Sequence, residues 1–512
     1  MTNRSPAPAA PRDSSAVLLV RGDGEDLEVF LVERAPELRF FGGYFALPGG
    51  VRSADDLAAA DGDDERSLRL CATRELFEET GILLRGGTPS AQRAELRAEL
   101  LREDGDVAAA TERTRRFVAA TQALAAADTL TPVCRITTPP FAPVRYDTLF
   151  CLARLPDGET PDVRAGELVS GRFVQPRAIL AAWRRGEVLL VPPVVILLQL
   201  LVHGDVARFL RDAARIAGEY RAGALHRVQF TPGIVMASVA TPTLPPATTT
   251  NCMIVGEDRL QVVDPGTHDR DEQARLLQLL DELCAEGRTV DGVLLTHHHI
   301  DHIGAADVVA KHFGVAVRAH PTTLQRLAGR FRAGAPLHDG DRIALGQAPD
   351  GTPDWHLVAT FTPGHDRGHL CFRESRYDAV CVGDMLSTVS SIVIDPPEGH
   401  MRTYLASLER LLAEPMGTLY PAHGPAARDG HTKIRQYLRH RSTREANLVR
   451  IVRETPGTLT ELLPKVYWDV DARMHAIAIR SLLAGLEKLA EEGHVVERDG
   501  TWSARADAGD TP

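Results

Sequence analysis

Hydrophobic residues follow two kinds of pattern along the chain, and these patterns predict where strands and helices form. Short runs rich in valine, leucine and phenylalanine predict strands, whereas apolar residues that recur every three or four positions predict helices. Both patterns mix in the first part of the chain, which favours an α+β domain there. The expected strands span 15–21, 27–34 and 145–155, and the expected helices span 68–84, ending at Gly81, and 92–128.

The pattern changes after a Pro- and Thr-rich stretch that follows this first region. Strand, helix and strand then alternate at 259–266, 274–287 and 290–299, which is typical of an α/β domain. From Lys433 the chain is helical and ends in a hairpin-like pair at 493–504, which favours a small winged-helix module. The expected parts are a disordered tail at 1–14, an α+β domain at 15–215, a linker at 216–234, an α/β domain at 235–430, a winged-helix domain at 431–505 and a tail at 506–512.

The longest apolar stretch, 188–202, is interrupted by Pro192 and Pro193. A helix that crosses a bilayer needs about 20 apolar residues, so we expect a buried helix that begins at the prolines. The N-terminal Pro/Ala-rich tail lacks the apolar core of a signal peptide. We therefore expect a cytoplasmic protein with no membrane partner.

Charge and cysteine content narrow the class of protein. The 512 residues carry a formal net charge of −11, which argues against a surface that is basic all over. The seven cysteines are scattered and odd in number, which fits reduced thiols better than a disulfide framework. The negative charge balance of the chain reverses locally at 433–453, where seven Lys/Arg accompany a single acid, Glu445. This helix would either face nucleic acid or dock on an acidic catalytic domain, and we favour docking.

A histidine-rich motif, THHHIDHIG, follows the predicted strand at 290–295. If the backbone stays extended, His297 and His299 point the same way, and Asp301 and His302 come from the turn that follows. These residue types would serve two metal ions a few Å apart. Other ligand-type residues recur at the ends of apolar runs, namely Asp264, His365, Asp384 and His423.

The motifs THHHIDHIG, TPGHDRGH, VGDML and YPAHGP, in this order over about residues 235–430, resemble those of the metallo-β-lactamase superfamily, especially its glyoxalase II/β-lactamase-like hydrolases. The resemblance implies an αββα sandwich with two Zn²⁺ ions, or another transition metal such as Fe or Mn, and catalytic roles for Asp301 and Asp384. The variable His298 would not coordinate. By this resemblance His297, His299 and His365 would bind one metal, Asp301, His302 and His423 the other, Asp384 would bridge them, and Asp264 would orient ligands.

A second motif, RELFEETG, places Glu75, Glu78 and Glu79 on one helical face. Three carboxylates on one face are either a solvated acidic surface or a cation site. The motif and the preceding LVERAPELRFFGGYFALPGG resemble the Nudix signature of coenzyme A diphosphatase-like proteins, over about residues 15–215. The resemblance implies an α/β/α sandwich in which the three glutamates hold Mg²⁺ or Mn²⁺, Glu78 and Glu79 are catalytic, and Arg74 pairs with a glutamate.

Two departures from the Nudix pattern bear on the activity of this domain. Gly50 lies 24 residues before Arg74, so about ten residues rich in Asp and Ala are inserted, and Arg66 stands where the pattern has a glutamate. A decayed Nudix domain that serves as a scaffold is therefore an alternative for the N-terminal half.

The expected function is that of a metal-dependent hydrolase of small-molecule esters or thioesters, including coenzyme A-type substrates, fused to a Nudix-like diphosphatase domain. The alternative is an endoribonuclease or RNA-processing phosphodiesterase that uses the basic tail, because the tail resembles the winged helix of a subset of β-lactamase-like hydrolases. The expected partner is a small-molecule substrate, and RNA is the alternative partner.

Overall fold

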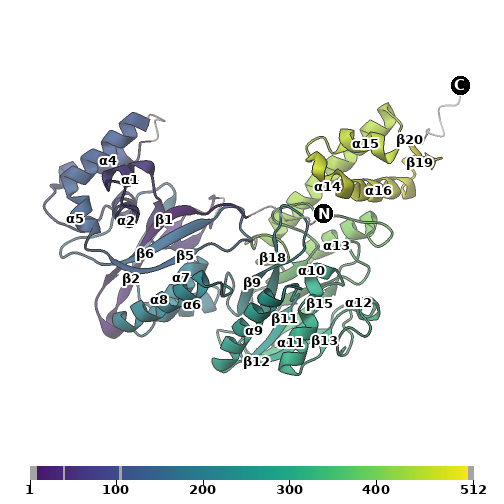
Figure 1. Ribbon diagram of the computed structural model, residues 1–512, viewed down its shortest axis with the longest axis horizontal. Helices are drawn as coiled ribbons and strands as arrows, with labels where there is room; N and C mark the ends of the chain where they lie inside the picture. The colour runs from purple at the N-terminus through teal and green to yellow at the C-terminus, as the bar shows by residue number, and fades with distance from the viewer. Residues whose placement is uncertain (1–7, 39–40, 103–106, 506–512) are drawn as a thin grey trace. The chain divides into compact units, whose positions relative to one another are not determined.

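The computed structural model describes residues 8–38, 41–102 and 107–505. It separates into two compact units, one from Pro8 to Pro232 and one that starts at Gly233, and each is described by itself (Figure 1). Residues 1–7 and 506–512, which belong to the two expected tails, lie outside the described residues. No helix in the described ranges is long and apolar enough to cross a membrane.

The N-terminal unit is built on one mixed eight-stranded sheet with β1 in its interior. β1 (Arg12–Arg21) runs parallel to β6 (Tyr146–Arg154) and antiparallel to β2 (Glu28–Arg34) and β4 (Gly49–Val51). β1 and β2 are the strands expected at 15–21 and 27–34 and they pair as a hairpin, although β1 starts at Arg12, inside the expected tail. The remaining strands are β3 (Tyr44–Ala46), β5 (Thr131–Thr137), β7 (Leu168–Val174) and β8 (Leu189–Leu190).

Helices cover both faces of this sheet, which gives the expected α/β/α sandwich (Figure 1). On one face, Leu68 and Leu76 of α2 (Asp64–Thr80) share a core cluster with Val17 of β1. As predicted, α2 ends at Gly81, which adopts the left-handed conformation with a φ of 72°. The other face is covered by α6 (Pro176–Arg184), α7 (Pro192–Leu201) and α8 (Val206–Arg221).

Helix α7 is the buried helix predicted to begin at Pro192, whereas α8 continues to Arg221, into the expected linker. The segment 92–128 is helical, as predicted, but it is not one continuous helix. The left-handed backbone of Gln122, with a φ of 51°, cannot continue a right-handed helix. The segment instead forms α3 (Ser90–Leu100), α4 (Val107–Thr121) and α5 (Ala123–Ala127).

The unit that starts at Gly233 contains two five-stranded sheets in the predicted αββα sandwich. The first has the order β13-β12-β11-β10-β9 and the second the order β14-β15-β16-β17-β18. The strands of the first sheet are β9 (Ile234–Ala240), β10 (Thr249–Val255), β11 (Arg259–Val263), β12 (Thr289–Leu294) and β13 (Val317–Arg318). Those of the second are β14 (Arg342–Gly346), β15 (Trp355–Phe361), β16 (Leu370–Glu374), β17 (Val380–Gly383) and β18 (Leu419–Pro421).

Helices pack on the outer face of each of these sheets. α9 (Arg270–Ala285) and α11 (Ala306–Phe313) contact β12 of the first sheet. On the second sheet, Tyr404 and Leu408 of α13 (Met401–Ala413) share a core with strand β17. Two short helices, α10 (Ile300–Ile303) and α12 (Pro321–Arg326), lie in the connections.

The C-terminal part has the predicted winged-helix composition, three helices followed by a two-stranded wing. It comprises α14 (Gly430–Glu454), α15 (Leu459–Val466), α16 (His475–Glu491), β19 (Val495–Arg498) and β20 (Thr501–Ala504). The first half of α14 joins the core under α13 through Ile434 and Tyr437, and its second half joins the winged-helix core through Leu448 and Val452. One helix therefore belongs to both cores.

Candidate metal centres

The metal-ligand candidates of the second unit all follow strand ends. His297 and His299 come after β12, and Asp301 and His302 lie in α10. The other three follow later strands: His365 comes after β15, Asp384 directly after β17, and His423 after β18. Because these strand ends meet at one edge of the sandwich, four sequence motifs deliver their side chains to one place.

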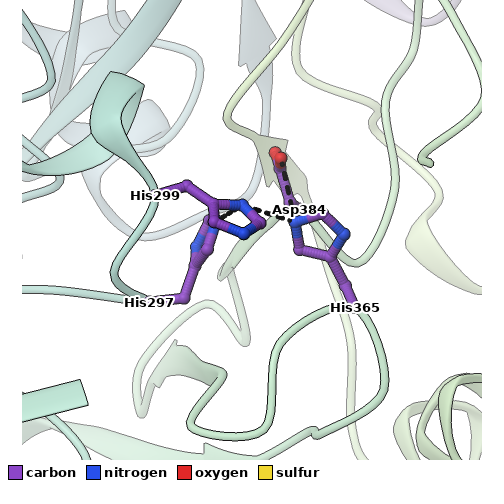
Figure 2. Close-up of side chains that lie close together, drawn as sticks. All are labelled: His297, His299, His365 and Asp384. Atoms are coloured by element: carbon purple, nitrogen blue, oxygen red, sulfur yellow. Dashed lines mark hydrogen bonds and ion pairs between the residues drawn. The ribbon is translucent and has the colours of Figure 1, made fainter. Parts of the chain in front are cut away.

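The first group contains His297, His299, His365 and Asp384, whose ligand atoms all lie within 4.8 Å of one another. Figure 2 shows the three rings and the carboxylate gathered around one point. His299 Nδ1 lies 2.9 Å from His297 Nε2 and 3.0 Å from His365 Nε2. This arrangement of three imidazoles and a carboxylate suits a transition metal.

The second group contains Asp301, His302 and His423, also within 4.8 Å of one another. Asp384 lies between the groups. Its Oδ2 is 3.5 Å from His365 Nε2 of the first group, whereas its Oδ1 is 3.3 Å from His423 Nε2 of the second. The two oxygens of one carboxylate therefore face the two groups.

The hydrogen bonds of the histidines leave one ring nitrogen directed at the centre. His365 Nδ1 donates to the Val393 carbonyl at 2.9 Å and His423 Nδ1 donates to the Thr249 carbonyl at 3.0 Å. Among the described residues, the buried atoms without a hydrogen-bond partner include His302 Nε2 and Asp384 Oδ1. Since buried polar atoms are nearly always partnered, these atoms fit a bound cation.

Asp264 is hydrogen-bonded to the second group and to Thr296, just after β12. Its Oδ1 accepts the Thr296 N–H at 2.8 Å, and its Oδ2 accepts from Thr296 Oγ1 at 2.6 Å and from His302 Nδ1 at 2.9 Å. Asp264 is buried and has a φ of 50°, a left-handed conformation that costs a non-glycine residue free energy. The surrounding fold therefore holds a strained backbone where it fixes a ligand.

The pKa values of His297 and His299 suit metal binding. Burial lowers the pKa of His297 well below its ordinary value and the pKa of His299 to about 3, and neighbouring imidazoles add to both effects. Both rings are thus neutral, the form that binds a metal. Burial opposes protonation of His302, but the carboxylates of Asp384 and Asp264 outweigh it and raise the pKa. Positive charge is therefore favoured beside Asp384.

Two buried residues of the centre escaped sequence reasoning. His369 Nε2 accepts the backbone N–H of Asp384 at 3.2 Å, and its Nδ1 lies 2.9 Å from Thr362 Oγ1. Asp366 forms an ion pair with His298 Nδ1, while Arg326 Nη1 lies 3.2 Å from His298 Nε2. Both missed residues belong to TPGHDRGH, so the signal was their place in a motif already recognised.

The three glutamates of the N-terminal unit lie on α2, near its C-terminal end. Arg74 Nη1 donates to Glu75 Oε1 at 2.9 Å and to Glu78 Oε1 at 3.0 Å, and the Gly49 N–H donates to Glu79 Oε2 at 3.0 Å. Among the described residues, the groups with ligand atoms within 4.8 Å of one another do not include this trio. The glutamates are therefore held near one another but not gathered.

The insertion before α2 supplies a residue that holds Arg74. It folds into α1 (Ala54–Ala59), which begins with a capping box between Ser53 and Asp56. Asp56 is fully buried and accepts from Arg74 Nε at 2.9 Å and from Nη2 at 2.8 Å. Arg66, by contrast, lies on the surface and pairs with Asp128 at 3.0 Å. The insertion therefore contributes a carboxylate that pairs with Arg74, whereas Arg66 takes no part in this pair.

Burial raises the pKa of Glu78 to about 7 and that of Glu79 to about 8, and it raises the pKa of Glu75 as well. Gly50 packs against this site, because a Cβ at that position would lie 2.5 Å from the Glu75 carboxyl carbon. Three half-buried acids that resist ionisation fit a site where a cation replaces protons.

Family models match three parts of the chain. The NUDIX domain model matches residues 10–123, the Metallo-beta-lactamase superfamily model residues 245–423, and the Beta-lactamase associated winged helix domain model residues 458–502.

Similar proteins match the two halves of the chain separately. The chain is 31% identical over 182 residues to the "Probable metallo-hydrolase YqgX" of Bacillus subtilis, covering 34% of this chain and 83% of the relative. It is 26% identical over 261 residues to the "Atrochrysone carboxyl ACP thioesterase nsrC" of Aspergillus novofumigatus, covering 48% of this chain and 75% of the relative. A solved NUDIX hydrolase from Alicyclobacillus acidocaldarius is 27% identical with a TM-score of 0.33, covering 39% of this chain and 96% of that chain. The chain belongs to the metallo-β-lactamase superfamily of hydrolases, and it also carries a NUDIX domain and a β-lactamase-associated winged helix.

Proposed function

We propose that the second unit is a dinuclear metal-dependent hydrolase of small-molecule esters or thioesters. The observation that supports this most is Asp384, whose two oxygens face two histidine-containing groups. Zinc is the proposed metal, with iron or manganese as substitutes. In this proposal His297, His299 and His365 bind one ion, Asp301, His302 and His423 bind the other, and Asp384 bridges them.

When bound, two such cations supply Lewis acidity and lower the pKa of a water molecule. The protein's part is to fix the geometry. Asp264 and Val393 hold the outward nitrogens of His302 and His365, so that the inward nitrogens keep their directions. Thr243 Oγ1, 3.4 Å from His423 Nε2, offers a hydroxyl beside the second group to orient a polar substrate atom.

We propose thioesters of the coenzyme A type as substrates. The relative from Aspergillus novofumigatus is named as a thioesterase, which favours the thioester class. The NUDIX domain favours a substrate with a diphosphate, and Glu75, Glu78 and Glu79 would hold Mg²⁺ or Mn²⁺ against it. The proposed domain limits are those expected from the sequence, 15–215, 235–430 and 431–505 with a linker at 216–234, except that the first domain extends to Arg12 and Arg221 because β1 and α8 reach these residues.

The contacts of the basic helix α14 weaken the RNA alternative. Arg441 is buried and donates to the Ile392 carbonyl, and Arg444 Nη1 donates to Asp469 Oδ1 at 2.7 Å. Both side chains are therefore engaged within the unit. The docking of Arg441 uses a backbone carbonyl and tyrosine rings, however, and not the acidic surface that we expected.

The test is a hydrolysis screen of the purified protein with acyl-CoA thioesters, nucleoside diphosphates and short RNA. We expect Asp384→Asn to lose thioester hydrolysis but keep diphosphate hydrolysis, and Glu79→Gln to do the reverse. Each variant thereby serves as the control for the other. Wild-type protein that cleaves RNA and leaves every thioester intact would contradict the proposal.

A further inference from the structure

The segment 392–396 lies between β17 and α13 and supports the first metal group. His365 Nδ1 donates to the Val393 carbonyl at 2.9 Å, and this bond sets the direction of the His365 ring. With Nδ1 engaged, Nε2 faces His299 and Asp384. The position of the Val393 carbonyl therefore decides where one candidate ligand points.

Side chains of the winged-helix part hold the peptide groups on both sides of Val393. On α14, the Tyr437 hydroxyl accepts the Ile392 N–H, and Arg441 Nη2 donates to the Ile392 carbonyl. On α16, Ser481 Oγ accepts the Ile394 N–H at 3.1 Å. Val393 is thus flanked by two residues whose backbones are fixed by another part of the unit.

A second route leads from Arg441 towards Asp384. The Arg441 guanidinium carbon lies 5.5 Å from the centre of the Tyr404 ring and 5.4 Å from that of Tyr437. The Tyr404 hydroxyl donates to the carbonyl of Met385, the neighbour of Asp384, at 2.6 Å. The same arginine therefore contacts Ile392, next to the Val393 carbonyl that accepts from His365, and Tyr404, whose hydroxyl donates to the residue after Asp384.

The surroundings of Arg441 argue for a role in positioning. Its side chain is buried, and within the described ranges it forms no ion pair with a carboxylate, while its Nε has no hydrogen-bond partner. Burying an unpaired guanidinium costs free energy, so stability alone favours an apolar residue here. The arginine is explained if the segment it holds must stay in one place.

We propose that Tyr437, Arg441 and Ser481 are positioning residues of the first metal group. They fix 392–394 so that the Val393 carbonyl orients His365. The inference rests on the proposed metal function of that group. It gives the winged-helix part a task inside the hydrolase centre, since its helices hold a backbone segment of that centre.

The test compares the Tyr437→Phe/Ser481→Ala double variant with Arg444→Gln. The double variant removes two hydroxyls and keeps the aromatic ring, whereas Arg444 lies on the same helix but contacts Val466 and Asp469 within the winged-helix part. Three properties are measured: amide hydrogen exchange of 389–396 in metal-free protein, zinc affinity by chelator competition, and the visible spectrum of Co²⁺-loaded protein.

For the double variant we expect faster exchange at 389–396, a roughly tenfold to hundredfold weaker affinity for one of two zinc ions, and an altered Co²⁺ spectrum. Arg444→Gln should leave all three unchanged even if its melting temperature falls. If the double variant fails to fold, Tyr437→Phe and Ser481→Ala are tested singly, each with a smaller effect in the same direction.

Two zinc ions bound with wild-type affinity and spectrum by the double variant would overturn this inference and leave the proposed function intact. Equal weakening in Arg444→Gln would also overturn it, because the effect would then be general destabilisation. Wild-type protein that binds no zinc would overturn the proposed function, and this inference with it.

Discussion

The two candidate metal sites differ in how the chain brings their ligands together. The candidate histidine and aspartate ligands come from separate strand ends, and within each group their ligand atoms already lie within 4.8 Å of one another. The three glutamates come from one stretch of α2, and Arg74 donates hydrogen bonds to two of them. The first site is thus built by tertiary structure and the second by helix periodicity.

This difference has an energetic consequence. Where the fold holds the ligands in place, the free-energy cost of bringing them together is met during folding. A metal then binds to a site that is already formed. Where buried carboxylates keep raised pKa values, a cation must displace protons before it binds. We therefore expect tight, slowly exchanging transition metal in the second unit and weak, pH-dependent Mg²⁺ in the first.

The largest expected effect is that of Asp384→Asn. The amide keeps the shape of the side chain but removes the charge between the two groups. We expect loss of bound zinc and a fall in thioester hydrolysis greater than the roughly hundredfold cost of losing an outer partner of a metal ligand. Elemental analysis and kcat/KM check this, with Glu79→Gln as the control that keeps the zinc. Unchanged metal content in Asp384→Asn would contradict the bridging role.

The next effect concerns Asp56, which holds Arg74 in the NUDIX unit. Removing one partner of a buried ion pair typically costs about 3–5 kcal/mol, so Asp56→Asn should lower the thermal stability of this unit strongly and abolish diphosphate hydrolysis. Arg66→Ala is the matched control, because its pair with Asp128 is on the surface and its loss should change little. Equal effects of the two substitutions would show that the pair of Asp56 with Arg74 matters no more than a surface ion pair.

The same contrast between local and tertiary contacts explains which parts of these sites could be predicted from the sequence. The ligand motifs and the glutamate trio carry local signals, a strand end or a helical spacing, and their positions could be predicted. The function of Asp56 depends on a contact with Arg74, eighteen residues later, that an Asp/Ala-rich insertion does not announce. The support of Val393 by Tyr437 depends on α14, so only the tertiary structure reveals it.

A smaller effect is expected from pH on the metal-free NUDIX unit. Glu78 and Glu79 titrate at about 7 and about 8 when folded, well above the value of about 4.3 for an unfolded glutamate. The folded state therefore binds more protons than the unfolded state, and the stability present below the unfolded pKa is lost as pH rises through 7 and 8. Mg²⁺ replaces these protons, so its binding should strengthen over that range.

The measurement is the Mg²⁺-induced rise in the melting temperature of this unit between about pH 6 and about pH 8.5. We expect almost no rise at the lower pH and a clear rise at the higher pH. Glu79→Gln should flatten the pH dependence, because the carboxyl group with a pKa of about 8 is gone. A Mg²⁺ effect that is independent of pH would show that the glutamates are ionised without the cation.

The smallest effect on metal content is expected from substitution of His298. This substitution tests whether His298 belongs to the preformed metal site. His298 lies between two candidate ligands, but its Nδ1 pairs with Asp366 and its Nε2 lies 3.2 Å from Arg326 Nη1. His298→Ala should therefore keep both metals and most of the activity, while it lowers stability because buried Asp366 loses a partner. His297→Ala, the matched control, should lose metal. If His298→Ala loses metal as completely as His297→Ala, the cluster of His298, His299 and Asp366 takes part in metal binding, and the first group is not the one preformed by the fold.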